Sequence, residues 1–205
     1  MTIAFHRHPA WAALLALCSF IVAPAAPADD GPLGPVTRLQ ETLIGMMKDG
    51  PTIGFPGRRD RADAVVDQVF DVPQVTRAVL GRHYAGLTPA ERGALGRRVR
   101  AYAVATLASR FTRYDGERFD GTRVSRTDGG QARAKSRFLG AGGRATSLDY
   151  LLLRDGPRWR IVNVWFDGVS GTDIQRAEFE VFLRDGGASR LITRLDELIE
   201  RLGKE

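Results

Sequence analysis

The stretch RATSLDYLLLRDGPRWRIVNVWF, residues 144–166, decides the fold. Two extended runs, 144–154 and 158–166, flank a short turn-forming separator, which predicts an antiparallel β-hairpin. Strict alternation predicts one face made of Leu148, Tyr150, Leu152, Trp159, Ile161, Asn163 and Trp165, and a second made of Asp149, Leu151, Leu153, Val162, Val164 and Phe166. Both faces are largely apolar, which indicates a sheet that is covered on both sides or closes over a cavity.

Two more extended runs precede the hairpin, at 117–126 and 131–139. Their separators are again short and rich in Gly, so the sequence predicts a four-stranded antiparallel meander. Arg133, Lys135 and Arg137 alternate with smaller residues in the second run, as expected of an exposed outer strand.

The residues before the meander have helical periodicity. Apolar spacing and the Gly and Pro residues predict a helix over 32–48, a loop over 50–57, and short helices over 62–70 and 71–80. A capping box at Thr88 and Glu91 then opens a helix expected to reach about Tyr114. Its apolar residues form two faces: Leu95, Val99 and Tyr102, expected against helices, and Val104, Leu107, Phe111 and Tyr114, expected against the sheet.

Two helices are predicted after the meander. Thr172 and Gln175 form a second capping box, and the helix it opens should end before Gly186 and Gly187. A final helix carries the apolar residues from Leu191 to Leu202. The order of helices, meander and helices predicts an α+β domain.

Residues 1–28 have the pattern of a secretory signal peptide. Charged and polar residues precede an apolar run over 10–23, and Ala26-Pro27-Ala28 supplies the small residues of a cleavage site. The run is shorter than the roughly 18 to 20 residues of a permanent membrane anchor. We therefore expect cleavage after Ala28, export of the protein and one mature domain, 29–205. An uncleaved anchor and a lipid on Cys18 are the alternatives.

Composition narrows the possible chemistry. The 205 residues are 43% apolar and 26% charged, with one Cys and three His, as in an ordinary globular protein. Cleavage after Ala28 would remove the one Cys and leave His83 as the only His, while the loss of Arg7 would lower the net charge from +6 to +5. Cys–His nucleophilic sites, disulfide frameworks and Cys- or His-based zinc sites are thereby excluded. We expect no metal and no cofactor.

A secreted hydrolase of ester or glycosidic substrates is the alternative from another class. Ser170 lies in a Gly-rich turn that resembles half of a nucleophile elbow, with His83 as the only histidine base. Asp149 and Asp167 would be the carboxylate pair of a glycosidase. A simple turn and a packing histidine explain the first two residues equally well. No phosphate loop or dinucleotide fingerprint occurs, and export argues against a nucleic-acid partner.

After these exclusions the sequence describes an exported domain whose excess apolar surface lies on a small sheet and the helices around it. Burying each methylene of a lipid contributes about 0.8 kcal/mol, so a water-free interior suits such a ligand. Filled and hollow interiors use the same residue types, however, and periodicity alone leaves both open.

Several stretches, in one order along the chain, match a known family. They are Phe70–Pro73 leading to Ala78–Gly81, Tyr102–Phe119 (YAVATLASRFTRYDGERF), Leu148–Tyr150, Trp159–Val164 and Asp167–Gly187 (DGVSGTDIQRAEFEVFLRDGG). They resemble the MlaC family of periplasmic phospholipid-binding proteins, also described as toluene-tolerance auxiliary transport proteins. Within it they most resemble the hopanoid-biosynthesis-associated branch, HpnM.

The resemblance implies a non-enzymatic α+β carrier that shuttles phospholipid or hopanoid between inner and outer membranes. Its implied partners are an inner-membrane transporter of ABC/MCE or RND type and an outer-membrane lipoprotein complex, with the carrier itself a monomer. An apolar pocket between sheet and helices would bind the lipid. The candidate lining residues are Val104, Leu107, Phe111, Phe119, Leu148, Tyr150, Leu152, Ile161, Val162 and Val164.

Overall fold

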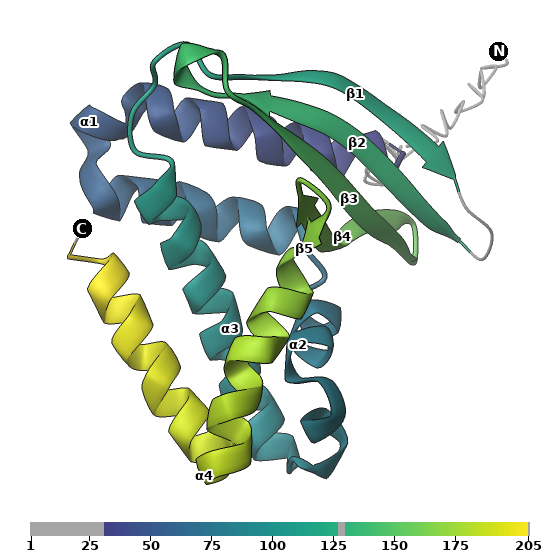
Figure 1. Ribbon diagram of the computed structural model, residues 1–205, viewed down its shortest axis with the longest axis vertical. Helices are drawn as coiled ribbons and strands as arrows, with labels where there is room; N and C mark the ends of the chain where they lie inside the picture. Colours follow the sequence, from purple (N-terminus) through teal and green to yellow (C-terminus); the bar gives the residue numbers. More distant parts are fainter. Residues whose placement is uncertain (1–30, 127–129, 205) are drawn as a thin grey trace, which may run out of the picture.

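An antiparallel sheet of five strands, in the order β1-β2-β3-β4-β5, forms one layer of the structure (Figure 1). The computed structural model describes residues 31–126 and 130–204, so the predicted signal peptide lies outside the described residues. The strands are β1 (Arg118–Arg126), β2 (Gln131–Leu139), β3 (Ala145–Asp155), β4 (Arg158–Phe166) and β5 (Val169–Ser170). The predicted four-stranded meander is confirmed. The fifth strand was missed because two residues are too few to form a pattern.

A β-bulge in β4 changes the predicted faces of the hairpin. Leu151 pairs with Asn163 and Leu152 pairs with Ile161, which leaves Val162 as an extra residue. Beyond this bulge the alternation is shifted by one residue. Val164 and Phe166 therefore share a face with their partners Tyr150 and Leu148, and the prediction of opposite faces was wrong. Asn163 and Trp165 were likewise assigned to the wrong face.

The outer face of the sheet is covered by long side chains. The Arg133 guanidinium lies 4.6 Å from the centre of the Trp165 ring, and Lys135 pairs with Asp149 at 3.7 Å. Lys135 and Arg137 are exposed as predicted, and Arg133 is partly buried. The prediction of an outer strand was wrong, because β2 lies between β1 and β3 in the sheet. Of the two predicted alternatives, a cover on both faces is not found over these strands, because the bulge turns Val164 and Phe166 inward. The sheet instead closes over a cavity.

Helix α1 (Leu33–Val69) consists of two helical segments, which we call its arms, separated by a kink. Gly54, with φ 61° and ψ −172°, breaks the helix, and the second arm runs back beside the first (Figure 1). A left-handed φ of this kind favours glycine. The predicted loop over 50–57 thus shrinks to one residue. The first arm continues past Gly50 and Pro51, and Pro56 fits at the start of the second arm, where a missing N–H has no helical partner to lose.

Helix α2 (Val72–Leu80) and the short 3-10 helix η1 (Gly81–Gly86) lead to α3 (Pro89–Arg110). The predicted capping box of α3 is present, with Thr88 accepting a hydrogen bond from the Glu91 N–H. The helix ends four residues before Tyr114. The buried Arg58 donates from Nε to the Ala108 carbonyl at 2.7 Å, which satisfies a last-turn carbonyl without further helix.

Helix α4 (Gly171–Leu202) also has two arms, which meet at Gly186 and Gly187 as predicted. Its N-cap is Ser170, whose hydroxyl accepts a hydrogen bond from the Asp173 N–H at 3.2 Å. The prediction that Thr172 caps this helix was wrong, because Thr172 is a buried residue of the first turn. A second short 3-10 helix, η2 (Ala141–Gly143), joins β2 to β3.

Two apolar cores result, and α3 contributes to both. The first, which we call the sheet core, packs α1 and the second half of α3 against the sheet, and includes Leu39, Leu43, Val104, Leu148, Tyr150, Leu152 and Ile161. The second, the helix core, joins α2, α3 and α4 through Val79, Leu80, Leu95, Val99, Phe179, Leu183, Ala188, Leu191 and Leu195. The two predicted faces of α3 are thereby confirmed except for Tyr114, which lies beyond the end of the helix and is 39% exposed.

Candidate functional site

A cavity of about 260 Å³, the main cavity, lies inside the sheet core. Its walls come from the first arm of α1, the end of α3 and the inner face of the sheet. They consist of Leu39, Leu43, Phe70, Leu107, Phe111, Phe119, Phe138, Thr146, Leu148, Tyr150, Val164 and Phe166. No side chain in this set is charged, so the main cavity suits an apolar ligand.

A second cavity of about 180 Å³, the side cavity, lies between α1, α2, α3, β4 and the start of α4. It shares four wall residues with the main cavity, namely Phe70, Leu107, Val164 and Phe166. Its one charged wall residue is Arg100, whose guanidinium pairs with Asp63 at 2.8 Å and with Asp67 at 2.6 Å. The hydrogen bond from Arg100 holds the pKa of Asp67 below its usual range. Arg100 is therefore engaged in joining α3 to α1.

Two larger hollows, of about 420 and 410 Å³, lie at the surface. One lies between the arms of α1 and the other between α2, η1 and α4, and charged residues such as Glu41, Arg61, Arg82 and Glu180 line them. Neither has an apolar wall that would hold a lipid away from water. The main and side cavities are therefore the stronger candidates despite their smaller volumes.

Aromatic rings close one end of the main cavity. The ring of Phe138 lies 5.1 Å from that of Phe119 and 6.3 Å from that of Phe111, the latter pair edge to face. These residues come from the start of β1, the end of β2 and the end of α3. Aromatic contacts of this kind add about 0.5–1.5 kcal/mol beyond burial, so they stabilise this part of the cavity wall.

Tyr150 supplies a polar group to the wall of the main cavity. Its hydroxyl accepts a hydrogen bond from Gln40 Nε2 at 3.4 Å, and the same amide donates to Ser136 Oγ at 3.0 Å. Burial raises the pKa of Tyr150, so the phenol stays neutral. The network satisfies buried polar groups without placing a charge in the cavity.

The structure places the predicted lining residues in three groups. Leu107, Phe111, Phe119, Leu148, Tyr150 and Val164 line the main cavity. Val162 lines the side cavity, as do Leu107 and Val164. Val104, Leu152 and Ile161 lie in the filled part of the sheet core and line neither cavity.

Sequence reasoning missed several wall residues. Leu39 and Leu43 were assigned to a helical stripe without a cavity, and Phe138 was grouped with the outer strand. Phe166 was placed on the opposite face because alternation does not reveal a bulge. Phe70, which ends α1, belongs to a stretch that matched the family but had no assigned role.

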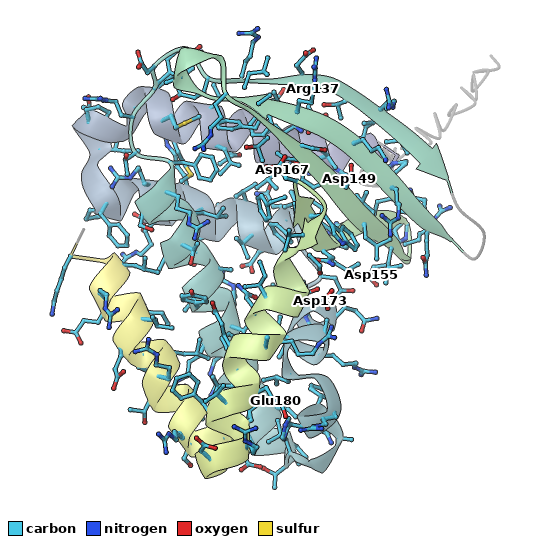
Figure 2. All side chains as sticks on the ribbon, viewed as in Figure 1. Arg137, Asp149, Asp155, Asp167, Asp173 and Glu180 are labelled. Atoms are coloured by element: carbon cyan, nitrogen blue, oxygen red, sulfur yellow. The ribbon has the colours of Figure 1, made fainter. Side chains whose placement is uncertain are left out.

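The residues of the alternative hydrolase do not form a site. Ser170 is the N-cap of α4, whereas His83 contacts Glu180 at 2.9 Å, ten residues further along the chain. Figure 2 shows Glu180 well along that helix. At 1.5 Å per residue the two positions are about 15 Å apart, so His83 is out of reach of the Ser170 hydroxyl. Although burial opposes it, the hydrogen bond from His83 helps to hold the pKa of Glu180 below its usual range.

The two candidate glycosidase carboxylates also have structural partners. Asp167 accepts a hydrogen bond from the Ser147 N–H at 2.7 Å, while Asp149 pairs with Lys135 on the outer face of the sheet (Figure 2). Within 31–126 and 130–204, no group of three or more His, Cys, Asp or Glu side chains could hold a metal ion. In the same ranges no helix has the length and hydropathy to cross a membrane.

An α+β fold with an uncharged cavity between its sheet and its helices is the architecture of a protein that binds an apolar ligand. Comparison with known proteins makes this more specific. The family model described as MlaC protein matches residues 37–197, and the chain belongs to the MlaC family. A search of curated proteins found no match.

Seven chains of solved structures match the fold. One is the phospholipid-binding protein from Ralstonia solanacearum, solved in complex with a phospholipid. It aligns with a TM-score of 0.67 at 19% identity, covering 85% of this chain and 99% of that one. At this identity the likeness concerns the fold.

Proposed function

We propose that this protein is a non-enzymatic carrier that binds a phospholipid in the main cavity and shuttles it across the periplasm. The observation that carries the proposal is the uncharged wall of that cavity, enclosed between sheet and helices. Membership of the MlaC family supports it, as does the phospholipid held by the Ralstonia solanacearum protein of the same fold. Acyl chains would occupy the cavity, each buried methylene contributing about 0.8 kcal/mol.

Loading requires the walls to separate. Cavities that hold drug-sized ligands typically have about 300–1,000 Å³, and the main cavity has about 260 Å³. A two-chain lipid therefore enters only if the helices move relative to the sheet. We propose that a membrane partner drives this opening, an inner-membrane transporter of ABC/MCE or RND type on one side and an outer-membrane lipoprotein complex on the other. The carrier would act as a monomer after removal of residues 1–28.

A hopanoid is the second ligand that the same wall would accept. A polycyclic hydrocarbon needs an uncharged, partly aromatic cavity as much as an acyl chain does, and Phe111, Phe119 and Phe138 supply aromatic surface. The resemblance of the chain to the hopanoid-associated branch favours this ligand. Identification of the bound lipid decides between the two.

Native mass spectrometry of protein purified from the periplasm tests the proposal. We expect a co-purifying lipid, and we expect added phospholipid to raise the melting temperature of delipidated protein. Absence of both effects would falsify the proposal. Turnover of an ester panel by the purified protein would instead support the hydrolase.

A pair of neighbouring substitutions localises the ligand. Thr146 lines the main cavity, whereas Ser147, the next residue of β3, points to the other face and is exposed. We expect Thr146→Arg to lose the lipid, because a charge in an apolar cavity is costly, and Ser147→Arg to retain it. Equal retention in both variants would place the ligand elsewhere.

A further inference from the structure

Four residues separate the main cavity from the side cavity, and one of them differs from the rest. Phe70, Leu107 and Val164 are partly buried members of the sheet core. Phe166, the last residue of β4, is 48% exposed although its ring contributes to both cavities. Displacing a half-exposed ring disturbs fewer contacts than displacing a core residue. Phe166 is thus the most easily moved part of the shared wall.

The β4 bulge places Phe166 in this position, and Asn163 holds the bulge. Its Oδ1 accepts hydrogen bonds from the N–H groups of Val164 at 2.8 Å and Thr172 at 3.2 Å. Its Nδ2 donates to Ser170 Oγ at 2.9 Å. Because Ser170 is the N-cap of α4, Asn163 ties the end of β4 to the start of that helix. The three residues that follow, Val164 to Phe166, are thereby held in the shifted register.

Gly171 packs closely against the end of β4. A Cβ at this position would lie 3.5 Å from Cε2 of Phe166 and 3.1 Å from the Val164 carbonyl oxygen. The shorter distance is tight for a contact with backbone. The first residue of α4 therefore fits closely against the wall between the cavities.

We propose that Phe166 is a specificity-determining residue that limits the length of the ligand, and that the side cavity is a second compartment of the same site. Asn163 is the positioning residue that keeps the ring between the two compartments. With the ring in place the apolar ligand is confined to the main cavity. With the ring absent or displaced, the end of the ligand extends into the side cavity. This inference rests on the proposed function.

Competition between phospholipids of different chain length tests the proposal. Delipidated protein is offered equal amounts of phosphatidylethanolamine with 14-carbon and with 18-carbon chains, and the bound ratio is read by native mass spectrometry. One more buried methylene corresponds to about fourfold in affinity. We expect Phe166→Ala to raise the ratio of bound 18-carbon to 14-carbon lipid by at least about fourfold.

Val169 provides the matched control. It pairs with Phe166 across β4 and β5, is 54% exposed and lines neither cavity. Val169→Ala should leave the ratio unchanged, and Phe166→Trp should lower it. If Phe166→Ala fails to fold, Phe166→Leu serves, with a smaller rise. A ratio equal to that of the wild type in the folded variant overturns the proposal while leaving phospholipid binding intact.

Substitutions of Asn163 test whether this residue positions the Phe166 ring or only stabilises the fold. Asn163→Ala removes the hydrogen bonds that hold the bulge and should shift the ratio in the same direction as Phe166→Ala. Asn163→Asp keeps the acceptor oxygens and should retain the wild-type ratio, whatever its melting temperature. An Asn163→Ala variant that is less stable but has an unchanged ratio contradicts the positioning role. A wild-type protein that binds neither lipid refutes the proposed function itself.

Discussion

The sheet core and the helix core use the same kinds of side chain but fill space differently. In the helix core, α2, α3 and the two arms of α4 enclose residues such as Leu95, Leu191 and Leu195, all 0% exposed. In the sheet core, side chains of the same types surround the main cavity. Apolar composition alone therefore does not create a cavity. The hollow arises where helices meet a bulged sheet and aromatic rings hold the walls apart.

A hollow core lacks contacts that a filled one has. Atoms that face a void lose dispersion partners on that side, so a cavity lowers stability unless a ligand fills it. The difference between the cores can be measured by substitutions in each of them.

The largest effect is expected in the helix core. Leu191→Ala should lower the free energy of unfolding by about 3–5 kcal/mol, because the fully packed site cannot collapse around the void. Leu43→Ala, in the wall of the main cavity, should cost only about 2 kcal/mol in the delipidated protein, since Leu43 already faces empty space. Urea denaturation measures both. Equal costs would mean that the main cavity does not persist in solution.

Substitution of Arg58 tests how the helices of the sheet core are held together. Arg58 donates to the carbonyls of Gly50 at 3.0 Å and Ala108 at 2.7 Å, joining the two arms of α1 to the end of α3. We expect Arg58→Met to cost about 1.5–3 kcal/mol and to weaken lipid retention, because two buried carbonyls lose a charged donor. The neighbouring Arg59 is exposed, and Arg59→Met should change stability by less than about 0.5 kcal/mol. Similar losses from both substitutions would contradict this role.

The Arg100 ion pairs beside the side cavity should have a smaller effect. Because Asp63 and Asp67 are more than half exposed, water screens the pairs, and Arg100→Gln should cost about 1 kcal/mol or less. The hydrogen bond from Arg100 lowers the pKa of Asp67, so this contribution is present above the usual value of 3.8 and is lost as the pH falls below it. Urea denaturation should show a smaller difference in the free energy of unfolding between wild type and Arg100→Gln at pH 3 than at pH 7. A constant gap would contradict this origin.

The smallest effect is expected for Tyr150→Phe. The hydroxyl is lost, but its hydrogen bond is long, at 3.4 Å, and Gln40 keeps its bond to Ser136, so the cost should be only about 0.5 kcal/mol. Burial raises the pKa of Tyr150, so its contribution is complete below the usual value of 10 and is lost as the pH rises above it. The wild type should therefore lose more stability than the variant above pH 10, as followed by denaturation. Parallel curves would contradict burial of the phenol.

Much of the fold could be predicted because its signals are local. The capping box at Thr88, the Gly pair at 186–187 and the short separators of the meander each act through their own backbone. The two faces of α3 followed from helical periodicity and correctly indicated two different neighbours. Local chemistry thus determines the order of the elements and the sides they bury.

The site was predictable only in part, because its geometry depends on one extra residue. Val162 lies within a run in which every side chain from Ile161 to Phe166 is apolar except Asn163, and a single polar residue does not reveal a change of face. The bulge depends instead on Asn163 reaching Ser170 and Thr172, contacts that exist only in the folded chain. For the same reason Phe166 was assigned to the wrong face, while Leu148 and Tyr150 were assigned to the right one.

The continuity of α3 has a consequence for how the molecule denatures. This helix of 22 residues gives its first half to the helix core and its second half to the sheet core without a break. If one core unfolded alone, half of α3 would be exposed while its other half stayed packed in the other core. Unfolding is therefore cooperative. Heating should therefore give a single unfolding transition, in which the sheet core and the helix core are lost at the same temperature.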